Sequence, residues 1–307
     1  MDIISFLLNP PSNLSIYEIL AISFILGILH GITPDEHTWP ITFSYAIGSY
    51  STKGGMKAGL LFSLGFTIQR GFLTFLGYIG LAYIYQKYNL DGPVYIAVGF
   101  VMAIVGYYVL KGRYFHIPLD KIFGAKEHHT EEACRVPPCE LLHKEIPIKM
   151  TFVHGIIAGF GFGAYATIIT FVLSPMVGSV YLSPLPGIFF GLGTMVMQVI
   201  IGALFGSILR TMKFKEEDIK YVGIGTASKT LYYGGIAFII IGIIVILIPP
   251  IDDFAISTGL KIPNIDAINI GLILVLFVVG IIGIYSLIKS YYEIKSKYNE
   301  IEKNGQK

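Results

Sequence analysis

The sequence predicts an all-α polytopic membrane protein with seven spans, built as two inverted three-helix repeats and one C-terminal helix. Three observations support this fold class. Of the 307 residues, 54% are hydrophobic and only 14% are charged, whereas a soluble domain carries about 25% charged residues. Several apolar runs exceed the roughly 18 residues that indicate a membrane span. Motifs in the first half of the chain also recur, in the same order, in the second half.

The first span is expected to begin at a capping box and to break near its end. Ser15 and Glu18 have the spacing of such a box, and the apolar run continues to about Gly31. Pro34 then removes a backbone donor and clashes with the preceding turn, so a helix must break or restart there. The short apolar piece Thr38–Tyr50 is therefore interpreted as a half-helix.

Six further apolar runs follow between polar turns. They are expected to span the membrane at residues 58–85, 94–110, 150–176, 187–209, 231–248 and 268–287. Glycines at 159, 161 and 163 interrupt one of these runs, so its helix is also expected to be broken. Residues 210–229 are expected to form a loop and residues 251–265 a turn.

The spans divide the chain into four parts. They are a first repeat (1–112), a cytoplasmic loop (113–147), a second repeat (148–250), and a C-terminal span with a charged cytoplasmic tail (251–307).

Lysine and arginine positions predict the orientation in the cell membrane. If the N-terminus lies outside, the cytoplasmic segments hold 19 of the 22 lysines and arginines. The other three are Arg70, within a span, and Lys87 and Lys261, in outer loops. The positive-inside rule therefore places the N-terminus outside and the C-terminus in the cytoplasm.

Short motifs indicate an internal repeat. The pairs are separated by 124, 128 and 136 positions and comprise His30-Gly31 with His154-Gly155, Gly59–Gly65 with Gly187–Gly193, and Gly99 and Gly106 with Gly235 and Gly242. Because each unit holds three spans, the second unit is inverted in the membrane. This architecture is typical of transporters, which bind substrate where the broken helices of the two units meet.

The residues around the first break form the strongest candidate site. Residues 30–37 read His-Gly-Ile-Thr-Pro-Asp-Glu-His, and Thr33 stands where a cap would start a new helix. Capping explains Pro34 and Glu36 but leaves both histidines unexplained. Imidazoles and carboxylates suit divalent first-row metals, and ionisable groups inside a membrane are usually functional. We predict a metal site made of His30, Asp35, Glu36, His37 and, from the second repeat, His154.

Each of these residues also has a purely structural interpretation. An intramembrane histidine such as His154 is often a packing residue bonded to a backbone carbonyl. Asp35 at a helix start is favourable without any ligand.

Three further polar residues are predicted to line a substrate pathway. An arginine inside a span is costly, so Arg70 is expected to face Asp35, Glu36 or a cavity. Either metal competes with Arg70 for the carboxylates, or Arg70 binds an anionic substrate. Gln69 is its polar neighbour. Gln198 could add a carbonyl ligand, although a methionine-rich helix face is more often a packing surface.

The cytoplasmic loop carries a second group of metal-ligating side chains. Thiolate and imidazole together suit zinc, nickel or copper, but the spacing is not that of a standard zinc site. Two reduced cysteines without a role are the other interpretation. The residues concerned are His128, His129, Cys134, Cys139 and His143.

Three motifs resemble those of the nickel/cobalt transporter family, whose wider superfamily includes the LysE exporters and the DsbD-type thiol carriers. Residues 30–37 resemble the family's His-Ala-x-Asp-Ala-Asp-His, with one extra residue between the histidines. Residues 62–67 are similar to Phe-Ser-Leu-Gly-His-Ser/Thr, with Phe66 in place of the histidine. Residues 190–195 are similar to Phe-Gly-Leu-Gly-Phe-Asp-Thr but lack the acid. The resemblance implies transport of a divalent metal. The broken helices lack the cysteines of the thiol carriers.

The expected function is secondary transport of a divalent transition-metal cation such as nickel or cobalt. The alternatives are an exporter of a sulfur-oxyanion-type anion or small solute that uses Arg70, and a non-transporting membrane assembly subunit. The sequence has no Gly-x4-Gly-Lys-Ser/Thr nucleotide motif, and no enzyme activity or permanently bound cofactor is expected. The partners expected are the lipid bilayer and the transported ion, without nucleic acid; homo-oligomerisation stays open.

Overall fold

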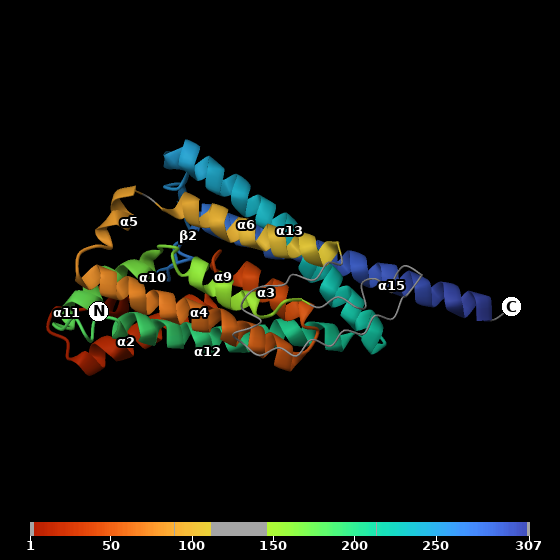
Figure 1. Ribbon diagram of the computed structural model, residues 1–307, viewed down its shortest axis with the longest axis horizontal. Coiled ribbons are helices and arrows are strands. Elements are labelled where there is room, and N and C mark those ends of the chain that lie inside the picture. Colours follow the sequence, from red (N-terminus) through yellow and green to blue (C-terminus); the bar gives the residue numbers. More distant parts are fainter. Residues whose placement is uncertain (1–2, 89, 112–145, 213, 306–307) are drawn as a thin grey trace.

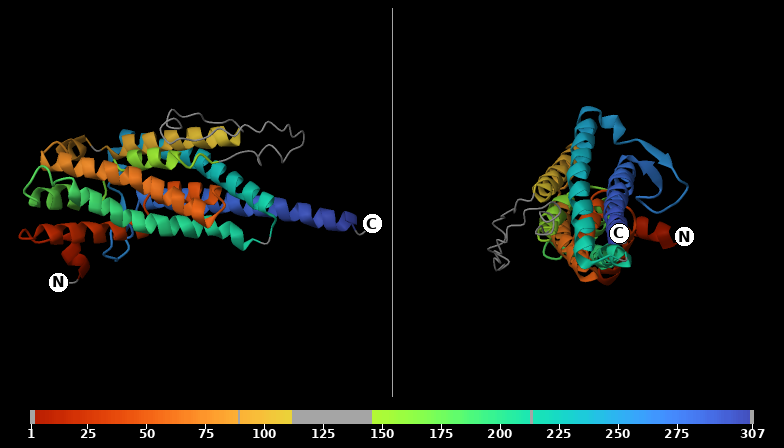
Figure 2. Two further views of the ribbon diagram at one scale, coloured as in Figure 1. Left: turned by 60° about the horizontal axis from the view of Figure 1, so that its bottom comes forward. Right: turned by 90° about the vertical axis from the view of Figure 1, so that its right-hand side faces the viewer.

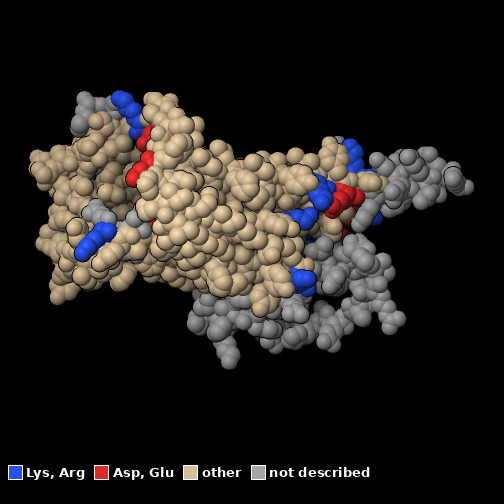
Figure 3. Space-filling model, turned by 90° about the horizontal axis from the view of Figure 1, so that it is seen from above, with Lys and Arg blue, Asp and Glu red and all other residues tan. Residues whose placement is uncertain are grey.

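The protein is a multi-pass membrane protein whose long helices run along one axis (Figure 1). The computed structural model describes residues 3–88, 90–111, 146–212 and 214–305. Within them, five helices are long and apolar enough to cross a membrane: Thr52–Tyr78, Asp91–Leu110, Leu185–Thr211, Glu216–Leu247 and Ile270–Ser296. Two apolar helices, Ile16–Ile32 and Ala164–Met176, are shorter. On the face drawn in Figure 3, charged side chains gather toward the two ends and leave an uncharged band between them.

The first half of the chain contains the predicted broken helix. Its elements are α1 (Ile3–Leu8), α2 (Ile16–Ile32), α3 (Trp39–Gly48), α4 (Thr52–Tyr78), α5 (Tyr83–Tyr88) and α6 (Asp91–Leu110). The capping box at the start of α2 is confirmed, because the Ser15 backbone N–H donates to the Glu18 carboxylate at 2.7 Å and the Glu18 N–H donates to the Ser15 hydroxyl.

The second half contains the second predicted break. Its elements are α9 (Met150–Ala158), α10 (Ala164–Thr167), η1 (Ile168–Leu173), α11 (Ser174–Met176), α12 (Leu185–Ile208), η2 (Leu209–Thr211), α13 (Glu216–Leu247) and η3 (Pro249–Ile251). The prediction of a loop over 210–229 is wrong for most of its length, since α13 begins at Glu216. Three acidic residues in its first turn suit the positive end of a helix, and residues 222–228 are buried.

The C-terminal part departs from the all-α prediction. Strands β1 (Ala255–Ser257) and β2 (Ala267–Asn269) form an antiparallel hairpin, with Ala255 opposite Asn269. Strand β1 lies within the predicted turn over 251–265, and β2 covers the expected start of the last span at residue 268. The continuous helical segment α14 (Ile270–Val275), η4 (Leu276–Gly283) and α15 (Ile284–Gly305) follows. The N- and C-termini lie at opposite ends of the long axis (Figures 1 and 2).

Helices from the two halves pack against each other through glycines. Helix α12 packs against α2 and α4, α9 packs against α4, and α6 packs against α13, which lie side by side in Figures 1 and 2. A Cβ atom at Gly99 would meet the carbonyl oxygen of Gly235 at 2.5 Å, and one at Gly235 would meet the Gly99 oxygen at the same distance. Only glycine allows the two backbones to approach so closely.

The glycine contacts of the first half recur in the second half at a spacing of 128 residues. In each contact, a Cβ atom on the glycine would overlap the backbone carbonyl oxygen of the residue named after it. Each contact has a counterpart in which the glycine lies 128 positions later and the carbonyl residue 128 positions earlier. These are Gly27–Phe190 and Gly155–Phe62, Gly65–Phe152 and Gly193–Phe24, and Gly59–Gln198 and Gly187–Arg70.

Candidate functional site

The break between α2 and α3 is confirmed, but its local structure differs from the predicted cap. Thr33 is extended (φ −77°, ψ 143°), as steric clash with the following Pro34 requires. Its hydroxyl donates back to the carbonyl of Leu29 at 2.9 Å, so it does not cap a new helix. Instead, the Asp35 carboxylate accepts the N–H of His37 at 3.0 Å, and α3 starts only at Trp39.

This turn brings the four predicted residues of the first repeat together. The Nδ1 atom of His37 lies 3.3 Å from Oε1 of Glu36 and 3.9 Å from Oδ1 of Asp35. The Nδ1 atom of His30 lies 3.8 Å from Oδ2 of Asp35. Ligand atoms of Asp35, Glu36 and His37 all lie within 4.8 Å of one another. His30, Asp35 and His37 are only 5–6% exposed.

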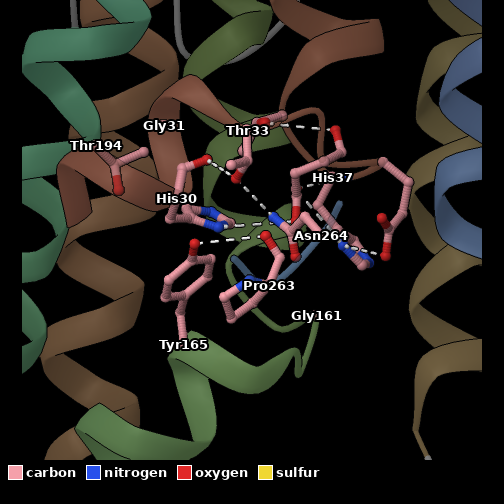
Figure 4. Close-up of polar contacts among 12 residues, drawn as sticks. His30, Gly31, Thr33, His37, Gly161, Tyr165, Thr194, Pro263 and Asn264 are labelled. Carbon is pink, nitrogen blue, oxygen red and sulfur yellow. Dashed lines mark hydrogen bonds and ion pairs between the residues drawn. The ribbon is translucent and has the colours of Figure 1, made fainter. Parts of the chain in front are cut away.

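The cluster lines a cavity of about 250 Å³ between the two broken helices. Besides the first break, its walls come from α4, α6, the second break and the β1–β2 hairpin with its flanks. Figure 4 shows Tyr165 of α10 beside His30, and Asn264 of the hairpin loop between His30 and His37. The described part of the lining holds five carboxylates, and Arg70 is its only lysine or arginine. The carboxylates belong to Asp35, Glu36, Asp91, Asp252 and Asp266.

Hydrogen bonds hold the cavity walls in place. The Tyr95 hydroxyl donates to Oε1 of Glu36 at 3.1 Å. The side-chain amide of Asn264 donates to the Thr33 hydroxyl at 3.1 Å, and the Tyr165 hydroxyl donates to the carbonyl of Pro263 at 3.4 Å (Figure 4). The hairpin loop is therefore tied to both breaks.

Two glycines leave room beside the side-chain atoms of His37 and Glu36 that could bind a metal. A Cβ atom at Gly161 would lie 2.5 Å from Nε2 of His37, and one at Gly271 would lie 2.5 Å from Oε2 of Glu36. Among the described residues, the buried Nε2 atoms of His30 and His37 have no hydrogen-bond partner. A buried imidazole nitrogen without a partner is energetically costly, so both rings are suited to an additional ligand.

His154 is not brought to this cluster. It is fully buried, its Nδ1 atom lies 3.0 Å from the carbonyl oxygen of Met150 and 3.3 Å from the Tyr45 hydroxyl, and it is absent from the described cavity lining. This geometry matches the packing interpretation of an intramembrane histidine rather than that of a fifth ligand.

Of the three predicted pathway residues, only Arg70 reaches the cavity. Its Nη2 atom donates to the carbonyl of Gly161 at 2.8 Å, and its guanidinium lies 4.7 Å from the ring centre of Phe66. Gln69 packs against Gly159 in the second break. Gln198 is fully buried and donates to the carbonyl of Gly31 at 3.1 Å. Its amide therefore binds the backbone of α2 and does not line the described part of the cavity.

The predicted cytoplasmic metal loop lies outside the described residues. This applies to all five of its members, His128, His129, Cys134, Cys139 and His143.

Sequence reasoning missed several polar residues of the cavity wall. Asp91 stood in an expected turn, Asp252 stood in another, and Tyr95 was one of many tyrosines. Each of these two acids sits where an outer turn meets a span, in a chain with few charges. That combination could have flagged them.

Comparisons with protein-family models, curated proteins and solved structures find no match to this chain. Its class therefore rests on the fold and the site: a multi-pass membrane protein with an acidic, histidine-containing cavity at two broken helices.

Proposed function

We propose that the protein is a secondary transporter of a divalent transition-metal cation, which binds at His30, Asp35, Glu36 and His37. The charge of the cavity is the observation that carries this proposal. Five carboxylates face one arginine among the described lining residues, inside a protein that crosses a membrane. An excess of acidic over basic side chains at such a site favours a cation, and a dication offsets the negative charge.

The donor set favours particular metals. Two ligands of one ion at about 2.1 Å lie roughly 3.0–3.4 Å apart, and His37 Nδ1 and Glu36 Oε1 are separated by 3.3 Å. Imidazole with carboxylate suits manganese, cobalt, nickel or zinc better than calcium or magnesium, which prefer oxygen alone. Nickel or cobalt in particular stays a prediction from the family resemblance.

The contacts also support the architecture that we propose, with seven spans arranged as two inverted three-helix repeats and one C-terminal helix. The glycine contacts that recur at 128 residues favour a pseudo-twofold relation between the halves. In this register His30 corresponds to Ala158 and His154 to Leu26, so the predicted pairing of His30-Gly31 with His154-Gly155 is four residues out of step. Both halves then share the break, but only the first carries the ligands.

The proposed orientation puts the cavity mouth on the outer side. Asp91 and Asp252 line the cavity and belong to turns that the positive-inside rule assigns to the outside. Carboxylates at such a mouth raise the local cation concentration. The termini at opposite ends of the molecule agree with an odd number of crossings (Figure 1).

Metal transport is tested directly with the purified protein in liposomes. Wild-type protein is expected to take up Co²⁺, Ni²⁺, Mn²⁺ or Zn²⁺ and to be stabilised against heat by the same ion, with Mg²⁺ and Ca²⁺ without effect at equal concentration. Protein that neither binds nor moves any of these ions would refute the proposal and favour an assembly subunit.

Substitution of Arg70 separates the metal transporter from the anion exporter. Arg70→Gln removes the positive charge of the described cavity lining. If Arg70 binds an anionic substrate, uptake of sulfite or thiosulfate is abolished. For a metal transporter we expect an altered affinity but an unchanged order of preference among the four metals, measured by competition in the liposome assay. Loss of the preference order would contradict the expectation.

A further inference from the structure

The second helix of each half holds the broken helix of the other half by a hydrogen bond from a buried side chain. Gln198 of α12 donates to the carbonyl of Gly31, at the end of α2, at 3.1 Å. Arg70 of α4 donates to the carbonyl of Gly161, between α9 and α10, at 2.8 Å. Positions 70 and 198 are 128 residues apart, which is the spacing of the glycine contacts.

Both acceptors are carbonyl groups that the breaks leave without a helical partner. An α-helical carbonyl accepts from the N–H four residues later, and for Gly31 that residue, Asp35, lies beyond the break. Gly161 lies between two helices. A buried carbonyl without a partner is costly, and the two side chains supply the missing donors.

Gln198 also contacts the other side of the first break. The hydroxyl of Thr42, in α3, donates to Oε1 of Gln198 at 2.6 Å. One amide thus joins α2, through Gly31, to α3, through Thr42. All of Asp35, Glu36 and His37 lie between these two attachment points, and His30 precedes the first.

We propose that Gln198 is a positioning residue that fixes the distance between α2 and α3, and thereby the geometry of the cation ligands. The inference rests on the proposed function. Gln198 does not touch the ion, since it is absent from the described cavity lining. Arg70 has the equivalent place in the other half, where it holds Gly161 beside Nε2 of His37.

The experiment uses Co²⁺ as the probe with the full-length protein in detergent, because its visible absorption bands report the geometry and donors of the site. Gln198→Met keeps the length of the side chain but removes both hydrogen bonds. Thr42→Val removes only the hydroxyl, and Thr42→Ser retains it. Thr194→Val is the matched control, since Thr194 donates to the carbonyl of Gly27 between the same two helices, one turn from the break (Figure 4).

Gln198→Met and Thr42→Val are expected to weaken Co²⁺ binding about tenfold and to change its absorption spectrum, because the binding-competent arrangement is less populated. Thr42→Ser and Thr194→Val are expected to keep the wild-type affinity and spectrum. Melting temperatures without metal identify any variant that is not folded. If Gln198→Met is not folded, the nearly isosteric Thr42→Val tests the positioning role.

Three outcomes would overturn the positioning role. The first is a wild-type spectrum and affinity in both Gln198→Met and Thr42→Val. The second is an equal loss in Thr194→Val, which would make the effect one of general packing. The third is a wild-type protein that binds neither Co²⁺ nor any of Ni²⁺, Mn²⁺ and Zn²⁺, and this is the one outcome that also removes the proposed function. In the first two outcomes, wild-type metal binding that is lost in His37→Ala leaves that function intact.

Discussion

Replacing His37 by alanine is expected to abolish metal binding and uptake. The Nδ1 atom of His37 lies within 4 Å of both carboxylates, at 3.3 Å from Glu36 and 3.9 Å from Asp35. Loss of a residue that only orients a metal ligand costs 10- to 100-fold in affinity, so loss of a ligand should cost more than about 100-fold. Isothermal titration with Co²⁺ and uptake into liposomes measure the effect.

His154→Ala is the matched control for this prediction. His154 is also a buried intramembrane histidine, but it contacts Met150 and Tyr45 rather than the cavity. We expect His154→Ala to lower the melting temperature and to leave metal affinity within about twofold, because a packing residue acts on folding and not on the ligand set. Equal losses of affinity in the two variants would contradict the assignment of the site to the first break.

The second large effect is expected from Gly27→Leu and Gly155→Leu. A side chain at Gly27 would overlap the carbonyl of Phe190, and one at Gly155 would overlap the carbonyl of Phe62. Backbone cannot move aside as a side chain can, so each variant should lose about 3 kcal/mol or more of the free energy of unfolding, at or above the upper end of ordinary overpacking. Thermal unfolding in detergent and the yield of folded protein measure the loss.

Gly280→Leu provides the control, because a Cβ atom at Gly280 meets nothing within 4 Å. Its melting temperature should match that of the wild type. Similar losses at Gly27 and Gly155 are expected if the two contacts are equivalent by the pseudo-twofold relation. Tolerance of leucine at one position and not at the other would argue against that relation.

Much of the fold is predictable from local sequence. Apolar runs identify the spans because a membrane helix must bury its own backbone polar groups. Pro34 identifies the first break and the glycines at 159–163 the second, since both act on the chain within one turn. The predicted loop over 210–229 was wrong because tertiary packing of α13 makes helix out of a segment whose polarity suggested a loop.

The site is only partly predictable for a different physical reason. His30, Asp35, Glu36 and His37 are close in sequence, and a single tight turn brings them together. Asp91, Asp252 and Asp266 come from other elements and meet them only after the helices have packed. No local sequence pattern predicts that these residues lie in the same cavity.

By itself the sequence determined that the chain crosses a membrane many times, that its first helix breaks at Pro34, and that two histidines and two acids gather there. These are properties of hydropathy and of backbone sterics, which act over a few residues. Only the tertiary structure decided that His154 faces Tyr45, that Gln198 joins α2 to α3, and that three distant acids complete the cavity. Such contacts depend on which helix faces pack together, and in this chain glycines set that choice by allowing backbones to touch.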